Sequence, residues 1–138
     1  MLALAMDKSA VKNFMGKMVR EEILDAFEVR TVEISAATHI SIEANPPTTW
    51  GELRPMIFEI LKLSAKPKHM KIVFSRANAE TLHTNAAALF LNLVYENDEL
   101  TFTTASSQKE FALDKSIDIA WDDWIRGFFK DFPISDRL

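Results

Sequence analysis

Three histidines, His39, His69 and His83, could act as acids, bases or metal ligands. None is spaced from another as HxH or HxxxH, the pairings that would place two imidazoles on one face of a strand or helix. His39 and Glu43 alternate onto one face of a predicted strand and form only a weak pair of potential ligands. We therefore expect no metal ion, and a hydrolase or transferase site would have to assemble in space around His39 or His83.

Signatures of cofactor chemistry are absent from the sequence. The three glycines, Gly16, Gly51 and Gly127, are isolated, so neither a phosphate-binding loop nor a dinucleotide fingerprint can be assembled from them. The chain has no cysteine, which excludes disulfides, thiolate metal sites and a cysteine nucleophile. We expect no cofactor, and a non-enzymatic role is favoured over catalysis.

A basic segment, KLSAKPKHMK at 62–71, is the main candidate for anion binding. Its lysines are Lys62, Lys66, Lys68 and Lys71. They could hold an anion, a nucleic-acid phosphate or an acidic partner, or they could simply keep a connector soluble. No aromatic residue is interleaved to stack on bases, and the net charge of −4 opposes a broad phosphate-binding face. Nucleic acid is therefore an unlikely partner.

Trp50 and Arg54 form a second candidate site, next to the proline-rich turn at 45–49. A tryptophan beside a rigid turn and a guanidinium could form the lip of a ligand pocket or anchor an interface. The alternative is a tryptophan folded over the core with Arg54 stacked on it.

Regular elements must position these residues, and the first half of the chain predicts five. Residues 2–6 indicate a strand, and Asp7 is placed to cap a helix whose apolar face carries Val11, Phe14, Met15 and Met18. Residues 27–43 predict a β-hairpin, closed off by a turn at NPPTT. Thr49 and Glu52 match a capping box for a helix at 50–62, in which Pro55 implies a kink or a later start.

The second half repeats this order. Residues 70–75 predict a strand, 77–83 a short helix, and the segment around 96–99 a polar turn between two β-rich arms. Residues 109–113 could add a third strand before Asp114 caps the last helix. The apolar stripe of that helix predicts a face buried in the core, with Phe129 at its edge as the aromatic residue closest to a partner: Ile117, Trp121, Trp124, Ile125, Phe128 and Phe132.

These elements predict an α+β fold, with a mostly antiparallel sheet and helices packed on one face. The order strand-helix-strand-strand-helix occurs twice, which indicates an internal duplication of 1–66 and 67–138. A shift of 71 positions aligns Trp50 with Trp121, and the two starting strands, 2–6 and 71–75, should be equivalent. Twin halves would leave a cleft at their junction. Similar architectures occur in duplicated effector-binding modules of bacterial regulators and in processivity clamps.

Length and composition set the class of protein. The 138 residues, 48% hydrophobic and 26% charged, are typical of one globular domain at 1–138. The apolar run at 1–6 is shorter than a secretory signal requires, and nothing predicts a membrane segment. We expect a cytoplasmic protein.

Several apolar motifs resemble those of a family of small uncharacterised clostridia-type Firmicutes proteins with a domain-of-unknown-function label. The motifs are VKNFM at 11–15, RPMIFEILK at 54–62, MKIVFS at 70–75, LNLVYENDELTFTT at 91–104, and FALDKS with AWDDWIRGFF within 111–129. The resemblance implies a single cytoplasmic domain and supplies no activity.

The sequence therefore favours a non-catalytic binding or interaction module with a protein or small-molecule partner, which could also form a homo-oligomer. A small hydrolase or transferase is the alternative, and a clamp-like accessory to nucleic acid is a third reading. An enzyme needs convergent polar groups in a pocket, a nucleic-acid binder needs lysine and arginine gathered on one face, and an interaction module needs an exposed apolar patch.

Overall fold

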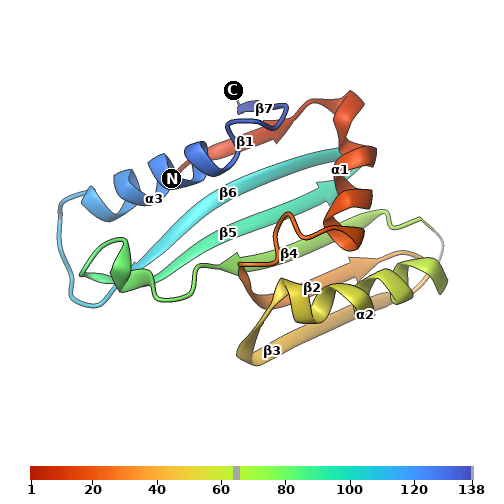
Figure 1. Ribbon diagram of the computed structural model, residues 1–138, viewed down its shortest axis with the longest axis horizontal. Coiled ribbons are helices and arrows are strands. Elements are labelled where there is room, and N and C mark those ends of the chain that lie inside the picture. The colour runs from red at the N-terminus through yellow and green to blue at the C-terminus, as the bar shows by residue number, and fades with distance from the viewer. Residues whose placement is uncertain (64–65, 138) are drawn as a thin grey trace.

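A computed structural model describes residues 1–63 and 66–137. In this part of the chain three α-helices lie over one face of a seven-stranded sheet (Figure 1). The strand order is β3-β2-β4-β5-β6-β1-β7, and every neighbouring pair is antiparallel. This confirms the predicted α+β class. In chain order the elements are β1 (Ala3–Met6), α1 (Lys8–Arg20), β2 (Glu28–Ser35), β3 (His39–Thr49), α2 (Trp50–Leu63), β4 (His69–Ser75), the 3-10 turn η1 (Ala79–Thr81), β5 (Ala86–Glu96), β6 (Glu99–Gln108), α3 (Ser116–Phe128) and β7 (Ile134–Asp136).

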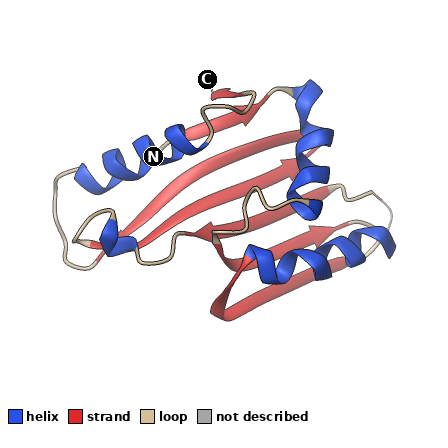
Figure 2. Ribbon diagram, in the orientation of Figure 1, coloured by secondary structure: helices blue, strands red, loops and turns tan. Residues whose placement is uncertain are grey.

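The sheet has one apolar face because its central strands alternate. On β4, Met70, Ile72 and Phe74 are fully buried, and their partners on β5 are the buried Tyr95, Leu93 and Leu91. Side chains two residues apart point to the same side of a strand, so these pairs form one continuous surface. The helices cover that surface (Figure 2).

The predicted turn between β5 and β6 is present and tight. It consists of Asn97 and Asp98, with φ of 53° and 62°. Both values lie in the left-handed region that two-residue hairpin turns require, and asparagine and aspartate tolerate it better than most residues. The two long arms therefore pair in one register from Glu96–Glu99 as far as Ala88–Ser107, beyond which the register shifts before the pair Ala86–Gln108.

The NPPTT segment is not the turn that its composition predicts. Strand β3 continues through it to Thr49, although the register shifts between the pairs Thr31–Glu43 and Val29–Thr48. The sheet tolerates two prolines here because β3 is an edge strand, where a missing N–H removes no bond to a further strand.

Helix α2 begins immediately after this strand, at Trp50 rather than at Pro55. The backbone N–H of Glu52 donates to Thr49 Oγ1 at 3.3 Å, which is one half of the predicted capping box. The Glu52 carboxylate accepts instead from the hydroxyl of Thr48. Pro55 lies inside the helix.

The C-terminal quarter departs from the prediction in two places. Residues 109–113 form no strand, because the side chains of Asn85 and Gln108 take up the backbone groups of Glu110 and Ala112 that a neighbouring strand would use. Helix α3 ends at Phe128, and the chain turns so that Phe129 points into the core. Phe129 is 3% exposed with its ring 4.8 Å from that of Phe102, so it cannot reach a partner as predicted.

The expected equivalence of the two halves is not reproduced in the sheet. Strand β1 lies between β6 and β7, whereas β4 lies between β2 and β5. Trp50 is the first residue of its helix, whereas Trp121 lies well inside α3. The order of elements does repeat, but the starting strands and the tryptophans occupy different positions.

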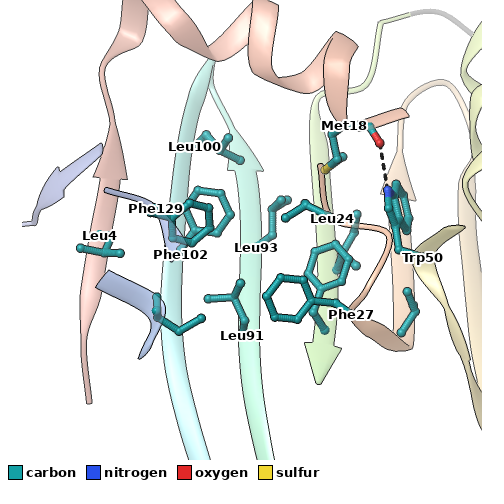
Figure 3. Close-up of a cluster of buried hydrophobic side chains, with 14 of the residues drawn as sticks. Leu4, Met18, Leu24, Phe27, Trp50, Leu91, Leu93, Leu100, Phe102 and Phe129 are labelled. Carbon is teal, nitrogen blue, oxygen red and sulfur yellow. Dashed lines mark hydrogen bonds between the residues drawn. The ribbon is translucent and has the colours of Figure 1, made fainter. Parts of the chain in front are cut away.

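The core joins α1, α2 and the sheet around Trp50. Its indole Nε1 donates to the carbonyl oxygen of Met18 at 2.9 Å (Figure 3). Its ring meets that of Phe74 edge-on, with centroids 5.6 Å apart. Trp124 on α3 is only half-buried and stacks between Trp121 and Phe128, with the Arg76 guanidinium 4.8 Å from its ring centroid.

We predict different stabilities for two tryptophan truncations. Trp50→Ala should lower the free energy of unfolding by about 3–5 kcal/mol, the usual cost of a cavity left by a large buried aromatic side chain. Trp124→Ala should cost clearly less, because water can fill part of the space. Urea unfolding of both variants measures the difference, and an equal loss would contradict the burial described for Trp50.

Candidate ligand-binding pocket

An open pocket of about 520 Å³ lies beside α1 and the β5–β6 turn. These elements are on the right in Figure 1, where α1 crosses the ends of β5 and β6. The pocket is formed by α1, the last turn of α2, the segment before β4 and the β5–β6 turn. Both sequence halves contribute to its lining: Lys8, Val11, Lys12, Met15, Gly16, Val19, Leu61, Lys66, Pro67, Met70, Tyr95 and Asp98.

The wall of this pocket is mainly apolar. Val11, Met15 and Val19 lie four residues apart on α1, a spacing that puts them in one row along the helix. Leu61 of α2 and Met70 of β4 add to this wall. Met15 and Leu61 are only half-buried, so apolar surface faces the open space.

Three lysines give the pocket its charge. Lys8 Nζ lies 3.3 Å from Glu99 Oε1, and Lys66 Nζ lies 2.6 Å from Asp98 Oδ1. Lys12 is exposed on the same face of α1, and it has no ion pair among the residues that the structure describes.

Asp98 connects Lys66 to Tyr95. The hydroxyl of Tyr95 donates to Asp98 Oδ1 at 2.9 Å, the same oxygen that Lys66 contacts. The hydrogen bonds from Lys66 and then Tyr95 lower the pKa of Asp98, and the bond to Asp98 raises the pKa of Lys66. Burial raises the pKa of Tyr95, and its bond to Asp98 adds to the effect. The cluster is thus an ionised Lys–Asp pair with a neutral phenol.

The four lysines predicted to bind an anion do not converge. Lys62 pairs with Glu59 at 3.5 Å and lies over the ring of Phe58. Lys71 points to the uncovered face of the sheet, because its neighbours Met70 and Ile72 point to the helices. Lys66 and Lys68 do meet at a smaller cavity of about 270 Å³ beside the first. Residues 64 and 65 of this segment lie outside the described residues.

Lys8 and Lys12 are the pocket lysines that sequence reasoning missed. The polar side of the α1 helical wheel contains both, but a helical wheel cannot tell which polar residues face a neighbouring element. The sequence offered one indication that these lysines border an apolar surface: Lys8 and Lys12 lie on the same side of the helix as Met15.

Trp50 and Arg54 lie elsewhere. Trp50 has 0% exposed surface, which leaves it nothing to offer a ligand, and Arg54 is not stacked on it. The guanidinium instead binds both carboxylate oxygens of Asp25, each at 2.9 Å. The hydrogen bond to Asp25 raises the pKa of Arg54. This pair joins the start of α2 to the segment after α1.

His83 lies in a cluster with Ser116 and Asp114 that resembles a nucleophile site in composition only. The backbone N–H of Asn85 donates to His83 Nδ1 at 3.1 Å, so Nε2 carries the proton and donates to Ser116 Oγ at 2.8 Å. The serine hydroxyl donates to Asp114, whose pKa the bonds from Ser116 lower. A base for Ser116 would need a free lone pair facing Oγ, which Nε2 lacks in this arrangement. The cluster therefore fixes the start of α3.

The remaining catalytic candidates are dispersed. His39 Nδ1 contacts Ser35 Oγ at 2.9 Å on an exposed hairpin end. Within residues 1–63 and 66–137 no three histidine, aspartate or glutamate side chains come together as a metal site would require. No helix in the same residues is long and apolar enough to cross a bilayer.

Large apolar side chains are exposed in the segment between β6 and α3. Phe111 and Leu113 are 84% and 85% exposed, and Ile119 in the first turns of α3 is also exposed. Two side chains hold the segment in place: Asn85 bonds to both backbone groups of Glu110, and Gln108 to both of Ala112. The apolar residues are therefore displayed on an ordered support.

The comparisons with known proteins identify a family but no function. Residues 41–135 match DUF5721, a family of unknown function, and the chain belongs to that family. The comparisons with curated proteins and with solved structures gave no match. The clostridia-type origin stays a prediction.

We predict that the exposed side chains of the β6–α3 segment contribute little to stability. Phe111→Ser should change the free energy of unfolding by less than about 0.5 kcal/mol, because exposed positions away from caps and networks rarely matter more. Asn85→Ala should cost more, since it removes both bonds to Glu110. Urea unfolding measures both, and a large loss in Phe111→Ser would show that the ring packs in solution.

Proposed function

We propose that this member of DUF5721 is a non-catalytic binding module that holds a small, mainly apolar molecule in the pocket beside α1. The proposal rests on the presence of the pocket. Its volume of about 520 Å³ falls in the range of about 300–1,000 Å³ typical of small-molecule sites, and it combines an apolar wall with a few charged groups.

The polar groups of the pocket support binding rather than catalysis. The bond to Asp98 raises the pKa of Lys66, and burial together with the bond to Asp98 raises the pKa of Tyr95. Both groups are thereby held in their protonated forms, whereas a general base must be deprotonated. Lys8 is paired with Glu99. A cytoplasmic location belongs to the same proposal, and the lack of cysteine supports it.

Filling the pocket tests this proposal. The fluorescent apolar anion 8-anilinonaphthalene-1-sulfonate should bind the folded protein at one site, and Met15→Trp should abolish the signal by occupying the space. Met56→Trp is the matched control, because Met56 is exposed on α2 and does not line the pocket. Melting temperatures of both variants establish that they are folded.

A second readout does not depend on variants. Tyr95 is the single tyrosine of the chain and lines the pocket, so the ring resonances of a tyrosine-labelled protein should shift on addition of the probe. Unshifted Tyr95 resonances at saturating probe, or equal binding by Met15→Trp and wild type, would contradict the proposal.

Association with a protein, including a second copy of the chain, is the second candidate. The ordered display of Phe111 and Leu113 favours it, because two large exposed apolar side chains close together in sequence offer apolar surface to a partner and a fixed segment loses little entropy on binding.

Sedimentation velocity tests the self-association form of this candidate. The weight-average sedimentation coefficient of the wild type should rise with concentration, and the double variant Phe111→Ser, Leu113→Ser should stay monomeric throughout. Identical concentration dependence of the two proteins would exclude this segment as the contact between copies.

A further inference from the structure

We propose that the ligand of the α1 pocket is an amphiphile with an alkyl chain and one carboxylate head, bound through Lys12 and Lys66. The proposal rests on the proposed function, since it names the ligand class of the same site. It goes further in assigning the head group, its charge and the residues that select it.

The charges around the pocket decide the charge of the head group. Lys8, Lys12 and Lys66 line the space, and Glu99 and Asp98 neutralise the first and the last of them. One positive charge, that of Lys12, is left uncompensated within the described residues. A ligand with a single negative charge restores neutrality, whereas a cation would add to the excess.

The geometry separates the head group from the chain. Lys8 reaches Glu99 and Lys66 reaches Asp98, which are consecutive residues at the β5–β6 hairpin, so the charged groups gather near the start of α1. Lys12, Met15 and Val19 line the pocket along one side of α1, and the helix rises about 10 Å between the first and the last of them. An alkyl chain can therefore lie along α1 with its carboxylate at the lysines.

Asp98 occupies the position that a ligand carboxylate would seek. Its oxygen lies 2.6 Å from Lys66 Nζ and accepts from Tyr95, which are the two donors that a bound head group would use on this side. The Asp98 carboxylate therefore competes with a ligand carboxylate for Lys66 and Tyr95. It sits at a left-handed turn position, with φ of 62°, where asparagine is also accommodated, so its charge can be removed without altering the turn.

A head-group series tests the assignment. Decanoate, decanol, decyl phosphate and decyltrimethylammonium share one chain length and are titrated below their micelle concentrations, with the Tyr95 ring resonances as the readout. Decanoate should bind about tenfold more tightly than decanol, as expected for one charge-assisted contact near the surface. The cation should bind more weakly than decanol.

Charge variants locate the contact. Lys12→Gln should weaken decanoate binding about tenfold and leave decanol binding unchanged. Lys17→Gln is the matched control, because it makes the same change on an exposed position of the same helix that does not line the pocket. Asp98→Asn should strengthen decanoate binding several-fold and leave decanol unchanged, since it frees Lys66 and removes a like charge.

The outcomes separate this inference from the function on which it rests. If none of the amphiphiles shifts Tyr95, the pocket proposal itself fails. If decanol binds as tightly as decanoate, or if Lys17→Gln has the same effect as Lys12→Gln, the pocket stands and the carboxylate assignment is overturned. If the dianion of decyl phosphate binds more tightly than decanoate, the assignment of a singly charged head group is overturned.

Discussion

The hydrogen bond from the Trp50 indole to the Met18 carbonyl is the contact on which the arrangement of α1 and α2 depends. The last carbonyls of a helix lack partners within that helix, and a buried one needs a donor from elsewhere. Trp50 supplies it at zero exposure, while its own backbone N–H donates to Phe27. One residue therefore ties the end of α1, the entry to β2 and the start of α2 together.

The pocket follows from this constraint, because α1 packs on two sides. Phe14 and Met18 point into the core, where the ring of Phe14 meets that of Phe102 edge-on at 5.9 Å. Met15 and Val19 point along the neighbouring side towards α2. Since Trp50 holds α2 against the far end of α1, the helices meet there and leave the space beside the start of α1 open to the β5–β6 turn.

The sequence predicted what local rules determine and missed what distant contacts determine. The caps at Asp7 and Thr49, the turn at Asn97 and the alternation of β4 are set by neighbours within a few residues, and they were predicted. The continuation of β3 through its prolines depends on an edge position that only the sheet order supplies. Phe129 was misassigned because the helix ends one residue before it. Distant contacts also explain the lysines. Those clustered in sequence at 62–71 point in different directions, whereas Lys8 and Lys66, which are far apart in sequence, line the same pocket.

The stability of this molecule and the proposed ligand binding depend on different polar and aromatic groups, although the pocket shares part of its apolar wall with the core. Helix α3 lies on the left and α1 on the right in Figure 1, and the stacked rings of α3 and the Trp50 contacts involve no lysine of the pocket. Exposed ion pairs such as Lys8–Glu99 contribute little to folding, because water screens them and their long side chains lose entropy when paired. The lysines beside α1 can therefore be changed without disturbing the core. The fold does not require these lysines beside an apolar wall, and the ligand proposed above, which is part apolar and part charged, would account for that combination.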